Sequence, residues 1–497
     1  MSIGKNTAYN LVGFIIPTVL GLATVPAYIH LIGAARYGVL SLVWLILGYF
    51  GLFDLGLGRA TTQRIAELRD APRAERAKAF HTALITNLAI GVVGCLILWA
   101  AAYVIFSRVV ALAPDLRAEA VSATPLVALA LPIATTLGVL SGALMGREKF
   151  LLTNRISATS TTLFQILPLL VAWRVGVDLR MLVTASLLAR GFAVVSLWRA
   201  CRREFALDEP VAWDRAQLLR LLRYGSWMTL SSMTIPFLAF TDRFLIGSIL
   251  GPVAVTIYNV PSEAVKRVTG VAGSVASALF PRFATEGREE AVKLATYGAD
   301  LLYTLVTPAM AVGLVLMDPL MRLWLGQDIG AQAAPLARIF MLAYWLNTFL
   351  QIPFTRLQAG GRPDLVTKIM AAELLPYIAG LYWSLKSFGL AGGAWAFFIR
   401  MVVDGVLLSW FADTGFPRLR LMVCTLAALL GLEAWLTLGP VLALPSQIAL
   451  AAVVGLISTL AALLVMPEDL LNRLPLPQAL RRMLRSARFS APIGILS

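Results

Sequence analysis

The stretch YNLVGFIIPTVLGLATVPAYIHLI, residues 9–32, contains no aspartate, glutamate, lysine or arginine. After GAAR at 33–36, a second apolar run follows at 37–60, YGVLSLVWLILGYFGLFDLGLGRA, with one acid and one arginine. A helix needs about 20 consecutive apolar residues to cross the hydrocarbon core of a bilayer. The two runs therefore predict a pair of transmembrane helices joined by a tight connection. The first run is longer than the apolar part of a signal peptide, so we expect it to be retained.

The same pattern continues along the chain. Of its 497 residues 59% are hydrophobic and only 14% are charged, whereas soluble domains average roughly 25% charged residues. This composition excludes an ordinary soluble globule and predicts an all-α integral membrane protein. The hydropathy pattern predicts about fourteen transmembrane helices, at 9–32, 37–60, 81–106, 123–145, 152–173, 181–198, 225–250, 256–280, 298–317, 334–356, 366–387, 389–411, 421–439 and 446–466.

The basic residues predict the orientation of these helices. When the connections are assigned alternately to the two sides, the set that includes both termini holds about four times as many Lys and Arg residues as the other set. Short cytoplasmic loops carry such an excess. We therefore expect a multi-pass membrane protein with both termini in the cytoplasm. The net charge of +15 is explained by this topology, with anionic lipid rather than nucleic acid as its partner.

An internal repeat predicts how the helices are organised. Gly33 follows the first span and Gly251 the seventh, 218 residues later, while the Gly-Arg pairs at 146–147 and 361–362 are 215 apart. The two members of each pair lie at the ends of equivalent predicted spans, which cross the membrane in the same direction, so the repeat is parallel. Two six-helix lobes related in this way predict alternating access, in which a central cleft opens first to one side of the membrane and then to the other. The predicted parts are an N-terminal lobe at 1–198, a connector at 199–224, a C-terminal lobe at 225–411, two further helices at 412–466 and a tail at 467–497.

The tail combines apolar and basic residues at helical spacing. Leu480, Met483 and Leu484 recur on one face, with Arg481 and Arg485 among the residues of the other. This pattern predicts a short amphipathic helix on the anionic inner leaflet. A disordered basic tail is the alternative.

Charged residues inside the predicted spans are the candidate functional residues. A charge at the bilayer centre costs at least about 2.5–3.5 kcal/mol on insertion scales, so it usually faces protein or water and marks function. If the cations face a shared cleft, they attract an anionic head group, because the guanidinium fork of arginine matches phosphate. This hypothesis names a cationic substrate-binding cleft of Arg190, Arg243, Lys266, Arg267 and Arg400.

The acids in the spans leave two interpretations open. Glu263 precedes Lys266 and Arg267 by three and four residues, and Asp404 follows Arg400 by four, so these groups can pair on one helix face. Alternatively, an acid can bind a coupling cation, for which the candidates are Asp242, Glu263 and Asp404. Arg338 lies near the end of a span, where we expect it to extend towards the head groups.

The sequence offers few residues for metal binding, redox chemistry or ATP hydrolysis. Three cysteines (Cys95, Cys201 and Cys424) and two histidines are far apart and show no metal-ligand or redox spacing. No GxxxxGK[ST] loop for ATP phosphates is present. We therefore expect no catalytic residues, no metal and no cofactor.

Four stretches carry a resemblance to a known family. They are KNTAYNLVGFIIPTVLGLATVPAYIHLIGAARYGVLSL at 5–42, DRFLIGSILG at 242–251, ALFPRF at 278–283 and QAGGRPDLVTK at 358–368. Together they resemble the polysaccharide and O-antigen flippases of the multidrug/oligosaccharidyl-lipid/polysaccharide exporter superfamily, over essentially the whole chain. The pair Asp242-Arg243 stands where members of this family often carry an acid next to a base.

The resemblance implies a function without covalent chemistry. The expected activity is a flippase that moves undecaprenyl-diphosphate-linked oligosaccharide from the cytoplasmic to the periplasmic leaflet for surface polysaccharide biosynthesis. A monomer is expected, with membrane-bound polysaccharide polymerases as possible partners. One alternative is a drug or small-cation exporter of the same superfamily. A second is a polysaccharide polymerase or ligase, which the short outside loops disfavour because they hold few acids and arginines.

Overall fold

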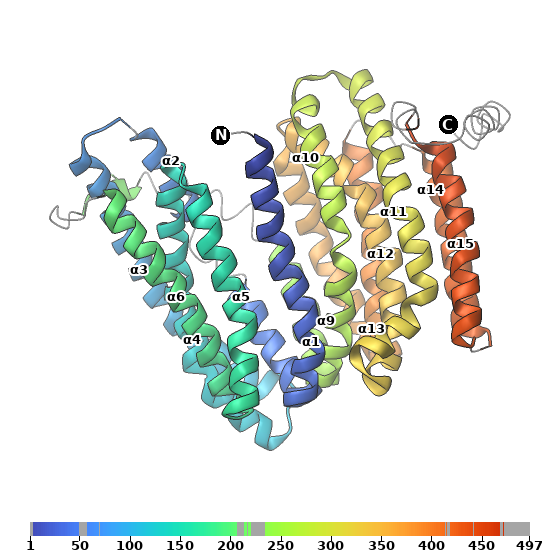
Figure 1. Ribbon diagram of the computed structural model, residues 1–497, viewed down its shortest axis with the longest axis horizontal. Helices are drawn as coiled ribbons and strands as arrows, with labels where there is room; N and C mark the ends of the chain where they lie inside the picture. The colour runs from blue at the N-terminus through green and yellow to red at the C-terminus, as the bar shows by residue number, and fades with distance from the viewer. Residues whose placement is uncertain are drawn as a thin grey trace. The chain divides into compact units, whose positions relative to one another are not determined.

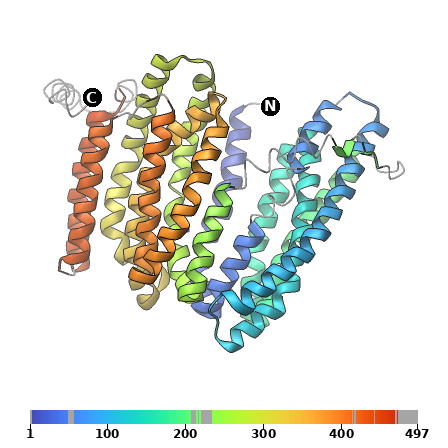
Figure 2. The same cartoon turned by 180° about the vertical axis from the view of Figure 1, so that it is seen from behind.

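The computed structural model describes residues 3–48, 57–68, 70–205, 213–215, 217–219, 234–412, 414, 418–440, 442–467 and 471. The chain packs as two compact units, residues 1–256 and 257–497. Within the described ranges every regular element is a helix. Figures 1 and 2 show the helices of the first unit in blue to green and those of the second in yellow-green to red. The predicted lobe boundaries stay a prediction, and the predicted amphipathic tail helix lies outside the described residues.

The first unit contains seven helices among the described residues. A π-helical turn, Ile105–Val109, extends the third of them in sequence. Their bounds are α1 Ile3–Gly48, α2 Leu57–Glu67, α3 Arg73–Val104, α4 Pro114–Gly146, α5 Phe150–Arg174, α6 Leu179–Phe205 and α8 Thr234–Leu250.

The division between the units falls within α9, and the second unit continues to α15. In both views α15 lies along α11. The helices are α9 Pro252–Lys266, α10 Thr269–Thr285, α11 Arg288–Leu325, α12 Gln327–Ala359, α13 Pro363–Phe411, α14 Leu419–Leu438 and α15 Leu444–Val465.

All fourteen predicted spans overlap described helices, so the predicted all-α membrane fold is confirmed. Ten described segments are long and apolar enough to cross a membrane. Each of two long helices extends from one predicted span into the next. The helix α1 breaks at Gly33 (φ 78°), between the first two predicted spans, and α13 breaks at Gly389 (φ 60°), where the span predicted at 389–411 begins. These positive φ values suit glycine, which has no Cβ to clash. The tight connection predicted after residue 32 is thus a single glycine break.

The repeat is visible in local geometry, with one correction. Gly33 and Gly251 both have positive φ, 78° and 84°, as expected of equivalent positions. Gly146 instead ends α4 inside the helix, and the residue equivalent to Gly361 (φ 74°) is Glu148 (φ 60°).

Hydrogen bonds at the two helix junctions fix this correspondence. The Lys149 amide donates to the Leu144 carbonyl at 3.0 Å, and the Arg362 amide donates to the Leu357 carbonyl at 2.9 Å. Both bonds span five residues, the pattern of a left-handed helix C-cap. The sequence match of Gly146 with Gly361 is therefore displaced by two residues from the structural match of Glu148 with Gly361. Similarity of residue types alone does not report backbone conformation.

The helices extend beyond the hydropathy windows. The span predicted at 181–198 lies within α6, which continues to Phe205. Its last turns stay helical because Leu197, Cys201 and Phe205 are buried in the core of the first unit, with Phe80 of α3 stacked on Phe205 at 5.1 Å between ring centroids. Polar residues on the opposite face lower the mean hydropathy there, so a sliding window ends the span too early.

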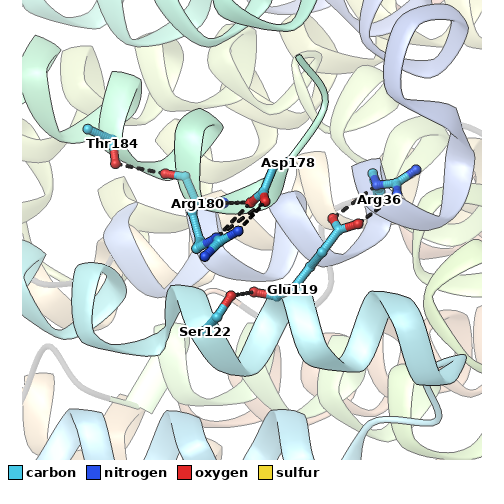
Figure 3. A network of polar contacts seen from close by, with 6 residues as sticks. All are labelled: Arg36, Glu119, Ser122, Asp178, Arg180 and Thr184. Carbon is cyan, nitrogen blue, oxygen red and sulfur yellow. Dashed lines mark hydrogen bonds and ion pairs between the residues drawn. The ribbon is translucent and has the colours of Figure 1, made fainter. Parts of the chain in front are cut away.

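A polar network joins three segments of the first unit at the end expected to face the periplasm (Figure 3). Arg36 of α1 forms a two-pronged ion pair with Glu119 of α4, with bonds of 2.7 and 3.1 Å. Arg180 of α6 pairs with Asp178 in the α5–α6 connection at 2.7 Å. The hydrogen bond from Arg180 lowers the pKa of Asp178 below its ordinary value. The charges of this network are thus already compensated by one another.

Candidate functional site

Arg190 is a cation deep in the first unit. It lies eleven residues from the start of the 27-residue helix α6, about 17 Å along the helix axis at 1.5 Å per residue. Its side chain is partly buried, and its guanidinium carbon lies 4.6 Å from the centroid of the Phe164 ring on α5. Among the described residues, Arg190 forms no hydrogen bond or ion pair. A cation at this depth, with an aromatic face and no acid beside it among the described residues, is a candidate anion site.

Packed aromatic rings hold Phe164 in place. The ring of Trp44 lies 5.5 Å from Phe164, and its indole nitrogen donates to the Ser186 hydroxyl at 3.2 Å. The Tyr28 ring packs edge-on against Trp44 at 5.2 Å, and its hydroxyl donates to the Gln165 carbonyl at 2.6 Å. These contacts fix the surface on which Arg190 lies, so the position of its charge is set by α1 and α5.

The other predicted cations of the substrate cleft have different surroundings. Arg243 of α8 is half-buried next to the buried Asp242 in sequence. Lys266 lies 3.6 Å from Glu263, which confirms the predicted pairing on one face of α9. Arg267 follows the last residue of α9 and is exposed. The Glu263–Lys266 pair is partly exposed on both sides, at 32% and 43%, so its contribution to stability is small.

A buried charge cluster, Glu373–Arg400–Asp404, lies within α13. Arg400 approaches Asp404 at 3.6 Å, as predicted, and also Glu373 at 3.8 Å. The two acidic side chains are only 6% exposed. Among the described residues, no donor is hydrogen-bonded to either Glu373 oxygen or to Asp404 Oδ1. Two buried carboxylates therefore face one guanidinium, and the cluster carries one excess negative charge when both carboxylates are ionised.

Arg338 corrects a prediction. It was expected to reach the head groups, but it is 8% exposed and forms a 3.0 Å ion pair with Glu433. Thr437 completes the contact, because its hydroxyl donates to Glu433 at 2.8 Å and accepts from Arg338 at 3.3 Å. Arg338 extends to a carboxylate because α14 packs across α12. Nothing in the sequence near either residue indicates that contact.

A second ion pair fixes α14 at its other end. The Arg418 guanidinium donates two hydrogen bonds to the Asp300 carboxylate of α11, at 2.9 and 3.0 Å. These bonds raise the pKa of Arg418 above its ordinary value. Thr304 of α11 also donates to the Ala462 carbonyl of α15 at 3.3 Å. The last two helices are thus held to the second unit by polar contacts as well as by packing.

An apolar cavity of about 200 Å³ lies between α11, α12, α13 and α14. Its wall includes Trp345 and Phe349 of α12, Val406 of α13 and Met422 of α14. Ser409 is the one residue with a polar side chain other than tryptophan among those that line it. The wall of the cavity is almost entirely apolar, so it suits a hydrocarbon chain rather than a charged head group.

The sequence-predicted site residues fall in both units. Arg190, Asp242 and Arg243 belong to the first unit, and Glu263, Lys266, Arg267, Arg400 and Asp404 to the second. Within the second unit, the structure brings Arg400 and Asp404 together with Glu373, an acid in the span predicted at 366–387 for which sequence spacing indicates no partner. The convergence of the five cations on one cleft stays a prediction.

Comparison with known proteins gives a consistent picture. A family model described as "Polysaccharide biosynthesis protein" matches residues 3–285, more than half of the chain. A putative O-antigen transporter of Shigella flexneri is 26% identical over 415 residues, which cover 82% of this chain and 97% of that protein.

Two solved structures share the fold. The lipid II flippase MurJ in an inward closed conformation has a TM-score of 0.71 at 12% identity and covers 91% of this chain and 98% of its own. An inward-facing multidrug resistance MATE family transporter of the MOP superfamily has a TM-score of 0.61 at 16% identity, covering 87% and 96%. At these identities the structures show the fold alone.

Proposed function

The chain belongs to the polysaccharide biosynthesis protein family, and we propose that it is a flippase for undecaprenyl-diphosphate-linked oligosaccharide. The cargo moves from the cytoplasmic to the periplasmic leaflet by alternating access, for the assembly of a surface polysaccharide. The described Shigella relative is named a putative O-antigen transporter, and it matches most of this chain. The proposal extends that similarity to the chemical class of the cargo and to the residues that bind it.

The observation that carries the proposal is the uncompensated charge of Arg190. A cation at mid-depth is costly unless a counter-ion or water stabilises it. No described residue supplies that counter-ion, so an anion from outside the protein fits the site. The diphosphate of a lipid-linked sugar is such an anion, and its oxygens match the two-pronged donor geometry of a guanidinium. Arg243, Lys266 and Arg267 remain candidates for further contacts with the head group.

The apolar cavity supports a lipid-linked cargo rather than a free sugar. Leu419 and Met422, at the start of α14, contribute to its wall. The distribution of basic residues predicts that this end of α14 lies towards the cytoplasm. A prenyl chain that entered from the cytoplasmic leaflet would therefore be covered on several sides. Burial of each CH₂ group contributes about 0.8 kcal/mol relative to water, although a chain that arrives from lipid gains less.

Reconstitution tests the function directly. Purified protein is placed in liposomes with a fluorescent undecaprenyl-diphosphate-linked oligosaccharide, and the label exposed to an added membrane-impermeant quencher is measured over time. We expect the protected label to become quenchable only in liposomes that contain protein. Deletion in cells should remove the surface polysaccharide and leave drug resistance unchanged. Lost drug resistance with intact polysaccharide would instead support the drug-exporter alternative.

The cluster Glu373–Arg400–Asp404 is the coupling site in this proposal. Because two buried carboxylates face one guanidinium, occupancy by one proton or one monovalent cation neutralises the site. Arg400 is thereby assigned to the coupling site rather than to direct contact with phosphate. Asp242 and Glu263, the other predicted coupling candidates, stay secondary, since Glu263 already pairs with Lys266.

Glu373→Gln is expected to uncouple transport from the ion gradient. The amide keeps the shape of the side chain but cannot be charged, so the site is neutral without an added ion. In proteoliposomes, an imposed proton or sodium gradient should accelerate the wild type, and Glu373→Gln should transport at the rate seen without a gradient. Asp364→Asn, at the exposed start of the same helix, is the control and should respond like the wild type. An unchanged gradient response of Glu373→Gln contradicts this assignment.

A further inference from the structure

The exposed side of α6 carries a column of apolar residues that ends in three arginines. Leu188, Phe192 and Val195 are 65%, 44% and 48% exposed, and the arginines Arg199, Arg202 and Arg203 are exposed as well. At about 100° per residue, the spacing of these six residues places them on one side of the helix.

The opposite side of α6 is committed to the protein core. Leu197, Cys201 and Phe205 are at most 4% exposed and belong to the buried cluster of the first unit. Arg190 also lies on this inner side, against Phe164. The apolar column and the three arginines therefore lie on the side of α6 opposite its core contacts and opposite Arg190.

The arginines are uncompensated within the part of the chain that the structure describes. The nearby acid in the same turn, Glu204, is already engaged by Arg147 at 3.2 Å and Lys149 at 3.4 Å. Arg199, Arg202 and Arg203 form no ion pair or hydrogen bond with any described residue. Three positive charges thus project at one end of an apolar column.

The dimensions fit one leaflet of a bilayer. From Leu188 to Arg199 the helix rises about 17 Å at 1.5 Å per residue. Half of a hydrocarbon core of about 30 Å is about 15 Å. The distribution of basic residues predicts that the arginine end lies on the cytoplasmic side. Acyl chains along the column would therefore bring a lipid phosphate level with the arginines.

We propose that this face of α6 binds an anionic phospholipid of the cytoplasmic leaflet. Its acyl chains pack on Leu188, Phe192 and Val195, and its phosphate accepts hydrogen bonds from Arg199 and Arg202 or Arg203. Charge complementarity selects an anionic head group over a zwitterionic one. The proposal concerns a lipid that stays in its leaflet and is independent of the transported cargo.

Binding to lipids of defined charge tests this site. Wild-type protein in detergent is titrated with cardiolipin or phosphatidylcholine, and bound lipid is counted by native mass spectrometry. A basic residue near an anionic surface contributes about 1 kcal/mol, roughly fivefold in affinity. We expect the wild type to prefer cardiolipin, and R199Q/R202Q/R203Q to lose that preference by on the order of 100-fold.

Two further variants keep the result interpretable. R199K/R202K/R203K retains the charges and should retain most of the preference. R108Q/R117Q/R174Q removes three exposed arginines at the other end of the first unit and should bind cardiolipin like the wild type. Undecaprenyl phosphate is the third probe. Equal cardiolipin binding by the wild type and R199Q/R202Q/R203Q overturns the proposal, as does an arginine-dependent preference for undecaprenyl phosphate alone.

Discussion

Arg190→Ala is expected to lower transport of a lipid-linked oligosaccharide by about 10- to 100-fold. Hydrogen bonds to charged groups contribute about 1.5–3 kcal/mol, and each 1.4 kcal/mol is tenfold in an equilibrium constant. The transport rate of Arg190→Lys should lie between those of the wild type and Arg190→Ala, because lysine keeps the positive charge but lacks the planar guanidinium. The measurement is the initial rate in proteoliposomes, normalised to the amount of protein.

Stability distinguishes a binding role of Arg190 from a structural role. Because no described residue pairs with Arg190, Arg190→Ala should keep or raise the melting temperature. The cargo should raise the melting temperature of the wild type and not that of the variant, since a ligand stabilises only the form that binds it. Arg174→Ala is the control, because Arg174 is exposed and stacks on Trp173 at 4.1 Å. Wild-type transport by Arg190→Ala would falsify the head-group assignment.

Glu433→Ala is expected to destabilise the second unit by about 3–5 kcal/mol. Removing one partner of a buried ion pair leaves the other charge uncompensated, and Arg338 and Glu433 have side chains only 9% and 7% exposed. The loss of the Thr437 contact acts in the same direction. Thermal unfolding in detergent, followed by the fluorescence of the tryptophans, measures the effect.

Two comparisons isolate the uncompensated charge as the cause. Arg338→Met with Glu433→Leu removes both charges and should recover most of the stability, because an apolar pair of similar volume often replaces a buried ion pair without loss. Asp364→Ala breaks the exposed Lys368–Asp364 pair of 2.9 Å and should leave the melting temperature nearly unchanged. If the double variant is as unstable as Glu433→Ala, the loss comes from packing rather than charge.

The helices were predictable because a transmembrane span is a local property. The run at 9–32 is apolar along its own length, whatever it packs against, so hydropathy locates it and the structure confirms it. The breaks at Gly33 and Gly389 follow the same logic, since glycine tolerates a positive φ. Hydropathy ends the predicted span before the end of α6, because the polar residues on the exposed side of its last turns lower the mean hydropathy although the other side is buried.

The sequence by itself determined the membrane fold, the number of spans and the set of charges that lie within them. Pairings between residues three or four apart, such as Arg400–Asp404, were also determined, because the pitch of the helix brings them together. Only the tertiary structure decided that Arg338 meets Glu433, that Glu373 joins Arg400, and that Arg190 lies against the ring of Phe164. Each of these contacts joins residues more than 25 positions apart. Which partner a buried charge acquires depends on how helices pack, and hydropathy and spacing carry no information about that.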